Sequence, residues 1–213
     1  MNILLTGFEP FGGEKSNPGW EVVRSLRGKS IEDCSIHIAK IPVAFDDAWP
    51  RMKKAMEETE PDIILSFGLA GKRNDITVEK IAINVMDAKQ EDNRGNKPTD
   101  EPILKHGREA YFVSVPPTLL VKALHGAKIP ASVSYSAGTF LCNYLMYRTL
   151  SHIEEEKKDM LFSYIHLPYM QEQVLERSLP SMDLKTMKKA AEVLVRTSLS
   201  YAQQRQIFWS KLR

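Results

Sequence analysis

The feature that most constrains the fold is a set of short apolar segments that alternate with longer amphipathic ones. Residues 2–8, 62–71 and 159–168 are apolar runs of strand length, and the second run ends in glycine. Such runs are typical of buried strands in parallel sheets. Strands that alternate with helices predict an α/β fold, in which helices cover both faces of a mainly parallel sheet.

Cap residues set the expected limits of two helices. Residues 17–26 predict a helix with Asn17 as its N-cap and Pro18 in its first position, where proline is well tolerated. A long helix over residues 183–206 is expected to open at Asp183.

A further helix is predicted within residues 45–62. We expect its start to be set by Asp46 or Asp47 and its end to fall before Pro61, because the residue before a proline disfavours the helical conformation. The other expected elements are a strand over 35–43, a strand over 75–85, and a strand, glycine turn and helix over 130–153.

A single domain over residues 1–213 fits the length and composition of the chain. The 213 residues are 43% hydrophobic, which is enough for a sizeable core, and no clear linker or internal repeat interrupts them. The least regular segment is 86–107, which is polar and contains glycine and prolines. Loops of this length in compact domains are usually functional or disordered, and we interpret this one as functional.

Charge and apolar patterning argue against several classes of partner. The 29 basic residues are scattered among 27 acidic ones, so no basic stripe indicates nucleic-acid binding. No apolar run approaches the roughly 20 residues of a membrane span, and the first residues do not resemble a secretory leader. Two cysteines, Cys34 and Cys142, form no disulfide framework, so we expect a cytoplasmic protein with free thiols.

Two residues are candidates for catalysis because of their places in the predicted elements. Cys142 follows a glycine turn and lies in or near the first turn of a helix if Ser136 or Thr139 caps it. A helix N-terminus stabilises a thiolate, although a free cysteine is also commonly a small buried apolar residue. His166 lies at the C-terminal end of an apolar strand, where catalytic groups gather in open sheets, although core histidines also occur in such runs.

Glu79 is a third candidate, because it lies within an apolar stretch and a buried carboxylate needs a partner. Arg73, Lys80 or a histidine can supply that partner, and a purely structural ion pair is the alternative. Taken together, Cys142, His166 and Glu79 match the set of nucleophile, base and orienting acid.

Metal and nucleotide chemistry fit the sequence less well. The five histidines show no HExxH spacing and the chain has no CxxC motif, so no metal site is expected. The glycine turn of residues 7–13 is followed by Glu14 and not by the lysine of a P-loop, and no GxGxxG follows a strand. We therefore expect no cofactor.

Four motifs in order along the chain carry a resemblance to a known family. The segments "LLTGFEPFGG", "GLAGKRNDITVEKIAINVMDA", "SYSAGTFLCNYLMY" and "IHLPY" together resemble pyrrolidone-carboxylate peptidase, also called pyroglutamyl peptidase I. The resemblance implies a three-layer α/β/α sandwich, often a homotetramer, and a metal-free cysteine peptidase that removes an N-terminal pyroglutamyl residue from peptides. It implies Cys142 as nucleophile, His166 as general base and then acid, and Glu79 as the residue that orients His166.

The resemblance also implies a substrate pocket. Phe8 and Phe11 of the "GFEPFGG" turn occupy positions that line the pyroglutamyl ring in the family, and core packing is the alternative for them. A lactam is flat and uncharged, so aromatic walls suit it. The other positions of the family pocket are filled here by Asn17, Phe140 and Leu141.

Three departures from the family pattern lie near this pocket. Leu69 replaces a common glutamine, Lys89 replaces a common arginine, and Gln90 is at a position that is usually apolar. Lysine keeps the positive charge of arginine but loses its planar fork. Two other functions stay open: a hydrolase or phosphorylase that holds an anion on the glycine turn, and a binding protein that lost turnover through Leu69 and Lys89.

Overall fold

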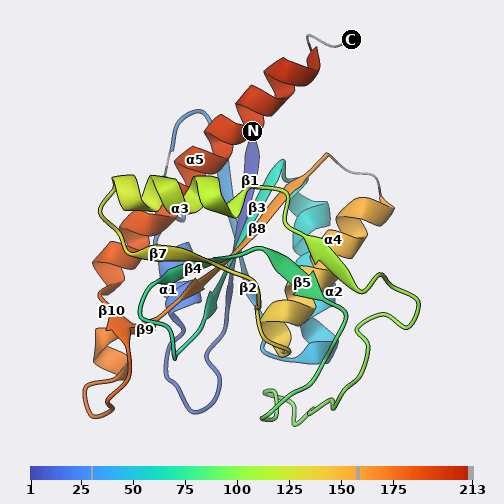
Figure 1. Ribbon diagram of the computed structural model, residues 1–213, viewed down its shortest axis with the longest axis vertical. Coiled ribbons are helices and arrows are strands. Elements are labelled where there is room, and N and C mark those ends of the chain that lie inside the picture. The colour runs from blue at the N-terminus through green and yellow to red at the C-terminus, as the bar shows by residue number, and fades with distance from the viewer. Residues whose placement is uncertain (30, 157–158, 211–213) are drawn as a thin grey trace.

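A central β-sheet between two layers of helices organises the chain (Figure 1). The computed structural model describes residues 1–29, 31–156 and 159–210. Within these residues the main sheet has six strands, in the order β2-β1-β3-β8-β4-β7. Their bounds are Asn2–Phe8 for β1, Ser35–Ile41 for β2, Ile63–Leu69 for β3, Ile76–Glu79 for β4, Ala131–Ser134 for β7 and Leu161–Leu167 for β8.

The strand direction reverses once across this sheet. Strands β2, β1, β3 and β8 are parallel to one another, whereas β4 is antiparallel to β8 and parallel to β7. The prediction of an α/β fold with a mainly parallel, mixed sheet is therefore confirmed. The reversal places Thr77 of β4 directly beside His166 of β8, which brings together the two strands that carry candidate residues.

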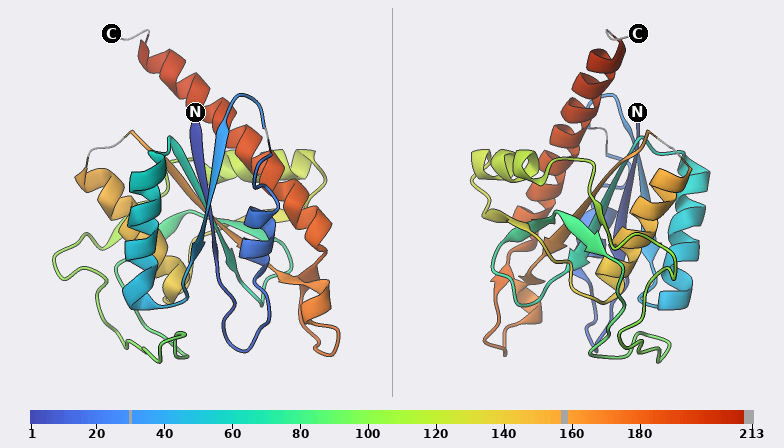
Figure 2. Two further views of the ribbon diagram at one scale, coloured as in Figure 1. Left: turned by 180° about the vertical axis from the view of Figure 1, so that it is seen from behind. Right: turned by 45° about the vertical axis from the view of Figure 1, so that its right-hand side comes forward.

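Helices cover both faces of the sheet, as Figure 2 shows most clearly from behind. Helices α1 (Pro18–Arg24), α3 (Pro117–Gly126) and α5 (Leu184–Ser210) lie on one face, and α2 (Phe45–Thr59) and α4 (Leu141–Glu155) lie on the other. The three-layer α/β/α sandwich is thus confirmed. Successive side chains of β1 point to opposite faces of the sheet and pack against both helical layers. Ile3 and Leu5 are buried with side chains of α1, α3 and α5, and Leu4 is buried with those of α2 and α4.

The predicted caps of α1 and α5 are confirmed. The Asn17 side chain accepts a hydrogen bond from the Gly19 N–H at 2.9 Å, and Pro18 is the first residue of α1. The Asp183 Oδ1 atom accepts from the Thr186 N–H at 2.8 Å at the start of α5. Each cap satisfies a helical N–H that has no partner within its own helix.

The predicted start of α2 is wrong by one or two residues, although its end before Pro61 is confirmed. The helix begins at Phe45, and Asp46 and Asp47 lie inside its first turn. The Phe45 N–H donates to Asp92 Oδ2 at 2.9 Å, so the stabilising carboxylate comes from the distant 86–107 segment and not from the local sequence.

The 86–107 segment is held against the start of α2 by several further contacts. The Asn93 N–H donates to the Val43 carbonyl at 2.8 Å, and the Asn96 side chain donates to Asp46 Oδ2 at 3.2 Å. Arg94 forms an ion pair with Asp47. The long loop is therefore anchored at its centre, and it connects β5 (Ile81–Ile83) to β6 (Ala110–Phe112).

Two sequence expectations around the site differ from the structure. Residues 75–85 form two strands, β4 and β5 (Ile81–Ile83), because the chain crosses at Lys80 to a separate small sheet with β6 (Ala110–Phe112). Helix α4 begins at Leu141, and its N-cap is Phe140, which gives no side-chain cap.

The side chains of Ser136 and Thr139 therefore do not cap α4. The Thr139 hydroxyl donates instead to the Asp87 carbonyl at 2.7 Å, and the Ser136 hydroxyl accepts from the Gly138 N–H at 3.3 Å. Both residues shape the turn that precedes the helix. Cys142 is the second residue of α4, so it lies in the first turn, within the range that the sequence predicts, although neither expected cap is used.

Helix α3 is the one helix longer than a single turn, among the described residues, that sequence reasoning missed. It begins at Pro117, after a run in which Val113 and Val115 are buried, so apolar residues continue from irregular chain into helix without a polar break. The short elements β9 (Tyr169–Met170), η1 (Gln171–Gln173) and β10 (Ser181–Met182) follow β8. None of the helices in the described ranges has the length and apolar character needed to cross a membrane.

Candidate active site

His166 and Glu79 form a buried contact near the C-terminal end of β8. The His166 Nδ1 atom lies 2.7 Å from Glu79 Oε1, and the two residues are 3% and 0% exposed. Because Thr77 is the register partner of His166, Glu79 two residues later points to the same face of the sheet. The antiparallel direction of β4 thus supplies the acid to a histidine from the parallel part of the sheet.

Cys142 approaches this pair from α4. It is partly buried and packs against the core on the α2 and α4 side of the sheet. Its Sγ atom and the His166 Cδ2 atom border one small space, at 3.1 and 3.3 Å from the position that a Cβ atom would take on Gly68. Because Glu79 occupies Nδ1, Nε2 is the ring nitrogen left to face the thiol. The structure therefore brings all three predicted residues into one chain of contacts at the edge where β3 and β8 end.

The two shifts in pKa at this contact favour a thiolate beside an imidazolium. Burial has the largest influence on the Cys142 thiol and raises its pKa, but the charge and hydrogen bond of His166, with the Tyr164 hydroxyl, bring that pKa below 9.0. Burial lowers the pKa of His166, whereas the charge and hydrogen bond of Cys142, followed by those of Glu79, raise it from 6.5 to about 9. A thiolate is the nucleophilic form of cysteine.

Two of the three partners that the sequence suggests for Glu79 contact it in the structure. Besides His166, Arg73 forms an ion pair and a hydrogen bond with Glu79 Oε1 and also reaches Thr77. The third option, Lys80, instead places its ammonium group 5.7 Å from the centre of the Phe112 ring. Burial raises the pKa of Glu79, but hydrogen bonds and the charges of His166 and Arg73 hold it below its ordinary value.

Arg73 also links Glu79 to the turn that precedes Cys142. Its Nη2 atom donates to the Ser136 carbonyl at 2.8 Å, and Ser136 lies in the turn that leads into α4. One guanidinium therefore holds both the carboxylate of β4 and the entry to the helix of Cys142. The planar fork of arginine suits such a double contact better than the ammonium of lysine does.

Gly68 of β3 leaves the space in which these groups meet, a role that sequence reasoning missed. A Cβ atom at this position would lie 2.5 Å from Tyr164 Oη, 3.1 Å from Cys142 Sγ and 3.3 Å from His166 Cδ2. Gly68 is the register partner of His166 in the parallel pair of β3 and β8. Tyr164 was also missed, although the two-residue period of a strand places it on the same face as His166.

The predicted apolar residues of the pocket are of two kinds, buried and partly exposed. Phe8 and Leu141 are 4% and 1% exposed and belong to one core cluster. Phe11 and Phe140 are only partly buried, and their ring centres lie 6.4 Å apart at an angle of 40°. Phe140 is the N-cap of α4, and Cys142 is the second residue of that helix, so Phe140 precedes Cys142 by two residues.

The polar and variable positions of the predicted pocket have different surroundings. Asn17 is buried, and its side chain bonds both the Gly19 N–H and the Glu9 carbonyl, so it shapes the "GFEPFGG" turn. Leu69 ends β3 opposite Leu167 and is partly buried. Lys89 is exposed in the 86–107 loop.

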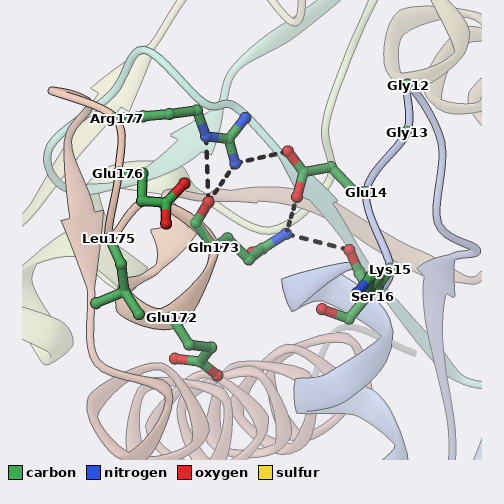
Figure 3. Close-up of a pocket in the computed structure, with 10 residues that line it drawn as sticks. All are labelled: Gly12, Gly13, Glu14, Lys15, Ser16, Glu172, Gln173, Leu175, Glu176 and Arg177. Carbon is green, nitrogen blue, oxygen red and sulfur yellow. Dashed lines mark hydrogen bonds and ion pairs between the residues drawn. The ribbon is translucent and has the colours of Figure 1, made fainter.

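A cleft of about 620 Å³ opens at the end of the "GFEPFGG" turn, next to Gly12 and Gly13 (Figure 3). Gln173 lies at its centre, where its Nε2 atom donates to Glu14 at 3.0 Å and to the Ser16 carbonyl at 3.2 Å. Arg177 closes the arrangement through an ion pair with Glu14 at 2.7 Å. The catalytic candidates do not line this cleft, and its contacts fasten the aromatic turn to the segment that follows β8.

No group of three or more histidine, cysteine, aspartate or glutamate side chains is arranged to hold a metal ion within the described part of the chain. Cys34 and Cys142 are both free. The groups that the site brings together are a thiol, an imidazole and a carboxylate, with a helix N-terminus at the thiol.

Sequence comparison relates this chain to one family. A family model described as pyroglutamyl peptidase matches residues 1–201. A pyrrolidone-carboxylate peptidase of Thermococcus onnurineus is 45% identical over 199 residues, which cover 93% of this chain and 99% of the relative. A pyrrolidone-carboxylate peptidase of an Enterobacter species is 43% identical, with coverage of 93% and 92%.

Solved structures give the same relationship. A mutant pyrrolidone carboxyl peptidase from Pyrococcus furiosus superposes with a TM-score of 0.92 at 39% identity, covering 94% of this chain and 99% of that one. Pyroglutamyl peptidase I from Bacillus amyloliquefaciens also gives a TM-score of 0.92 at 39% identity, covering 94% and 98%. The sheet and both helical layers are therefore shared along nearly the whole length.

Proposed function

The chain belongs to the pyroglutamyl peptidase family, and we propose from this premise that it removes N-terminal pyroglutamyl residues from peptides with Cys142, His166 and Glu79 as its catalytic residues. The observation that carries the proposal is the buried 2.7 Å contact between His166 Nδ1 and Glu79, with the Cys142 thiol on the other side of the same ring. This order of contacts is what a nucleophile, a base and an orienting acid require.

In the first step the Cys142 thiolate attacks the carbonyl carbon of the pyroglutamyl residue. A C–S bond forms and the carbonyl oxygen becomes an oxyanion. The first N–H groups of a helix have no partner within it, and Phe140 provides no side-chain cap to α4. The N–H of Cys142 and the positive end of the helix dipole are therefore suited to stabilise that oxyanion.

The imidazolium of His166 then completes the first half of the reaction. The C–N bond breaks as His166 donates its proton to the leaving amine, which yields a thioester and a neutral imidazole. His166 next removes a proton from water, the resulting hydroxide attacks the thioester, and the C–S bond breaks. Pyroglutamate leaves, and the thiolate and the imidazolium are restored. Glu79 keeps the ring oriented and stabilises its charged form throughout.

Substrate selection follows from the surface beside the nucleophile. Phe11 and Phe140 offer aromatic walls to a flat, neutral lactam, and Phe8 and Leu141 support them from the core. A charged N-terminal amine would lose its hydration there without gaining a partner, so ordinary peptides are disfavoured. Asn17 holds the turn, whereas Leu69 and Lys89 contribute through the backbone and through positive charge near the edge of the site.

We extend the proposal to the state of the protein in the cell. The family resemblance supports a single catalytic domain that assembles as a homotetramer in the cytoplasm. Within residues 111–120, Phe112 is 65% and Leu119 is 36% exposed, whereas Val115 and Leu120 are fully buried. The segment therefore contributes to the core and also presents apolar surface to another subunit. Sedimentation of the purified protein tests the tetramer.

The activity is tested with a pyroglutamyl arylamide. We expect hydrolysis by the reduced wild-type protein, and we expect both iodoacetamide and Cys142→Ser to abolish it, whereas Cys34→Ser is the matched control that retains it. Hydrolysis that persists in Cys142→Ser would refute the assignment of the nucleophile. A folded wild-type protein that binds pyroglutamate without cleaving the arylamide would instead be a binding protein.

A further inference from the structure

Tyr164 is placed beside the nucleophile by the same strand that carries His166. It lies two residues before His166 on β8 and is completely buried. Its ring centre lies 5.1 Å from that of the imidazole, with the planes inclined by 60°. Strand alternation directs both side chains to the face that α4 covers, so the phenol and the thiol approach each other from different elements.

The hydroxyl of Tyr164 is buried beside the sulfur of Cys142. Within the described residues, its oxygen is sealed from solvent and has no hydrogen-bond partner. The position that a Cβ atom would take on Gly68 lies 2.5 Å from this oxygen and 3.1 Å from Cys142 Sγ, so the two atoms border the same small space. Cys142 is therefore the polar side chain that borders this space together with the hydroxyl.

The direction of this interaction follows from the protonation states. Burial, together with the nearby Cys142 and Glu79 charges, raises the pKa of Tyr164 well above 10.0, so the phenol keeps its proton. A phenol can donate that proton, and a thiolate can only accept one. A buried hydroxyl without a partner is costly, so the thiolate form of Cys142 satisfies both groups at once.

We propose that the Tyr164 hydroxyl donates a hydrogen bond to the Cys142 thiolate and stabilises the ionised nucleophile before substrate binds. The proposal rests on the proposed function only for the role of Cys142 as nucleophile. The titratable groups that face Cys142 are His166 and Tyr164 of β8 and, beyond the imidazole, Glu79 of β4. His166 supplies the compensating charge, and Tyr164 supplies a neutral donor that keeps the thiolate ionised at lower pH.

A hydrogen bond from Tyr164 to Cys142 predicts a pH dependence that packing alone would not produce. A hydrogen bond to sulfur makes the thiolate more abundant at low pH, but it also withdraws electron density and makes each thiolate less reactive. Removal of the hydroxyl should therefore slow the reactions of Cys142 at low pH and leave them equal or faster at high pH. A variant that merely loosens the packing around the site would lose reactivity at every pH.

The test is the rate at which iodoacetamide alkylates Cys142, measured against pH by mass spectrometry of the peptide that contains it. In Tyr164→Phe we expect the midpoint of the profile to rise by about one pH unit, so that alkylation below the midpoint slows about tenfold. Tyr147→Phe is the matched control, because Tyr147 is equally buried but donates to the Arg108 carbonyl at 2.6 Å. Its profile should keep the wild-type midpoint.

An unchanged midpoint in folded Tyr164→Phe would overturn the proposal. Tyr164→Met removes the same hydroxyl with a flexible apolar side chain and carries the same expectation, so the test does not depend on one variant. A double-mutant cycle with Cys142→Ala gives a second readout: the effects of the two changes on unfolding should be non-additive at neutral pH and additive in acid. Alkylation needs no turnover, so a failure of the peptidase assay would refute the proposed function without deciding this test.

Discussion

The Nδ1 atom of His166 lies 2.7 Å from Oε1 of Glu79, and this contact joins two strands that run in opposite directions. A fully parallel sheet would carry both side chains at the ends of strands that point the same way. The reversal at β4 instead sets the acid alongside the histidine, within the sheet and away from solvent. Nδ1 is thereby fixed, and the remaining nitrogen is directed to Cys142.

Glu79→Gln should retain the fold but lower kcat by about a hundredfold or more, as occurs when the acid of a triad loses its charge. The raised pKa of His166, about 9, depends in part on this carboxylate. In the proposed mechanism the imidazolium donates the proton to the leaving amine, so wild-type kcat/KM should fall as pH rises through about 9. In Glu79→Gln that fall should occur at lower pH, and a pH–rate profile measures it.

The raised pKa of His166 also determines how the stability of the protein depends on pH. The folded pKa of His166 is above its ordinary value of 6.5, so its contribution to stability is fully present below pH 6.5 and is lost as pH rises through about 9. Chemical unfolding of wild type and Glu79→Gln across this range should show the difference between them shrink at the alkaline end. A difference that grows there would contradict this assignment.

Arg73→Met should lower kcat more than it raises KM, because within the described residues the contacts of Arg73 are with Glu79 and the Ser136 carbonyl and not with the proposed pocket residues. We expect a loss of about tenfold to a hundredfold, in line with the 1–3 kcal/mol cost of an unsatisfied buried polar group. Arg73→Lys should recover only part of it, since an ammonium lacks the planar fork. Arg24→Ala, which removes an exposed ion pair with Glu21, should leave the kinetics unchanged.

Gly68→Ala should abolish activity and destabilise the protein, because the new Cβ atom would meet Tyr164 Oη at 2.5 Å and Cys142 Sγ at 3.1 Å. Overpacking of this kind typically costs about 1–3 kcal/mol. Gly126→Ala is the control, since nothing lies within 4 Å of its added Cβ atom. Thermal unfolding and arylamide hydrolysis of both variants test the prediction, and an active, stable Gly68→Ala would refute the close approach at this position.

Asp92→Ala should destabilise the protein by about 1 kcal/mol, the usual cost of losing an N-cap. It should also raise KM, because Asp92 fixes the 86–107 loop to α2. Burial raises the pKa of Asp92, but the N–H groups of Phe45, Asn96 and Arg94 bring it below 3.8, so this contribution is present above pH 3.8 and is lost as pH falls further. Asn also caps helices, so Asp92→Asn should recover most of the stability without the pH dependence.

The elements that could be predicted from the sequence are those with local causes. The continuous apolar sequences of β1, β3 and β8 reflect the burial of both faces of each strand. The caps at Asn17 and Asp183 accept hydrogen bonds from N–H groups two and three residues later. Cys142, His166 and Glu79 could be named as candidates for the same reason, because each residue lies at an end of a regular element or is an isolated charge in an apolar run.

The features that the sequence did not predict depend on contacts between distant segments. Asp92 caps a helix that begins 47 residues earlier, and no local pattern indicates such a pair. The break at Lys80 depends on the small sheet that β5 forms with β6. The roles of Gly68 and Tyr164 depend on register between β3 and β8, because only the pairing of Gly68 with His166 reveals why a side chain is excluded there.

The most direct test of the central claim is to trap the acyl-enzyme. The protein is mixed with a pyroglutamyl arylamide, quenched in acid within the first turnovers, digested and examined by mass spectrometry. We predict one added pyroglutamyl group on the peptide that contains Cys142, and none on the same peptide of Cys142→Ser or on the peptide that contains Cys34. Hydrolysis of the arylamide without any adduct on Cys142, or with the adduct on another residue, would contradict the proposal that Cys142 forms the thioester.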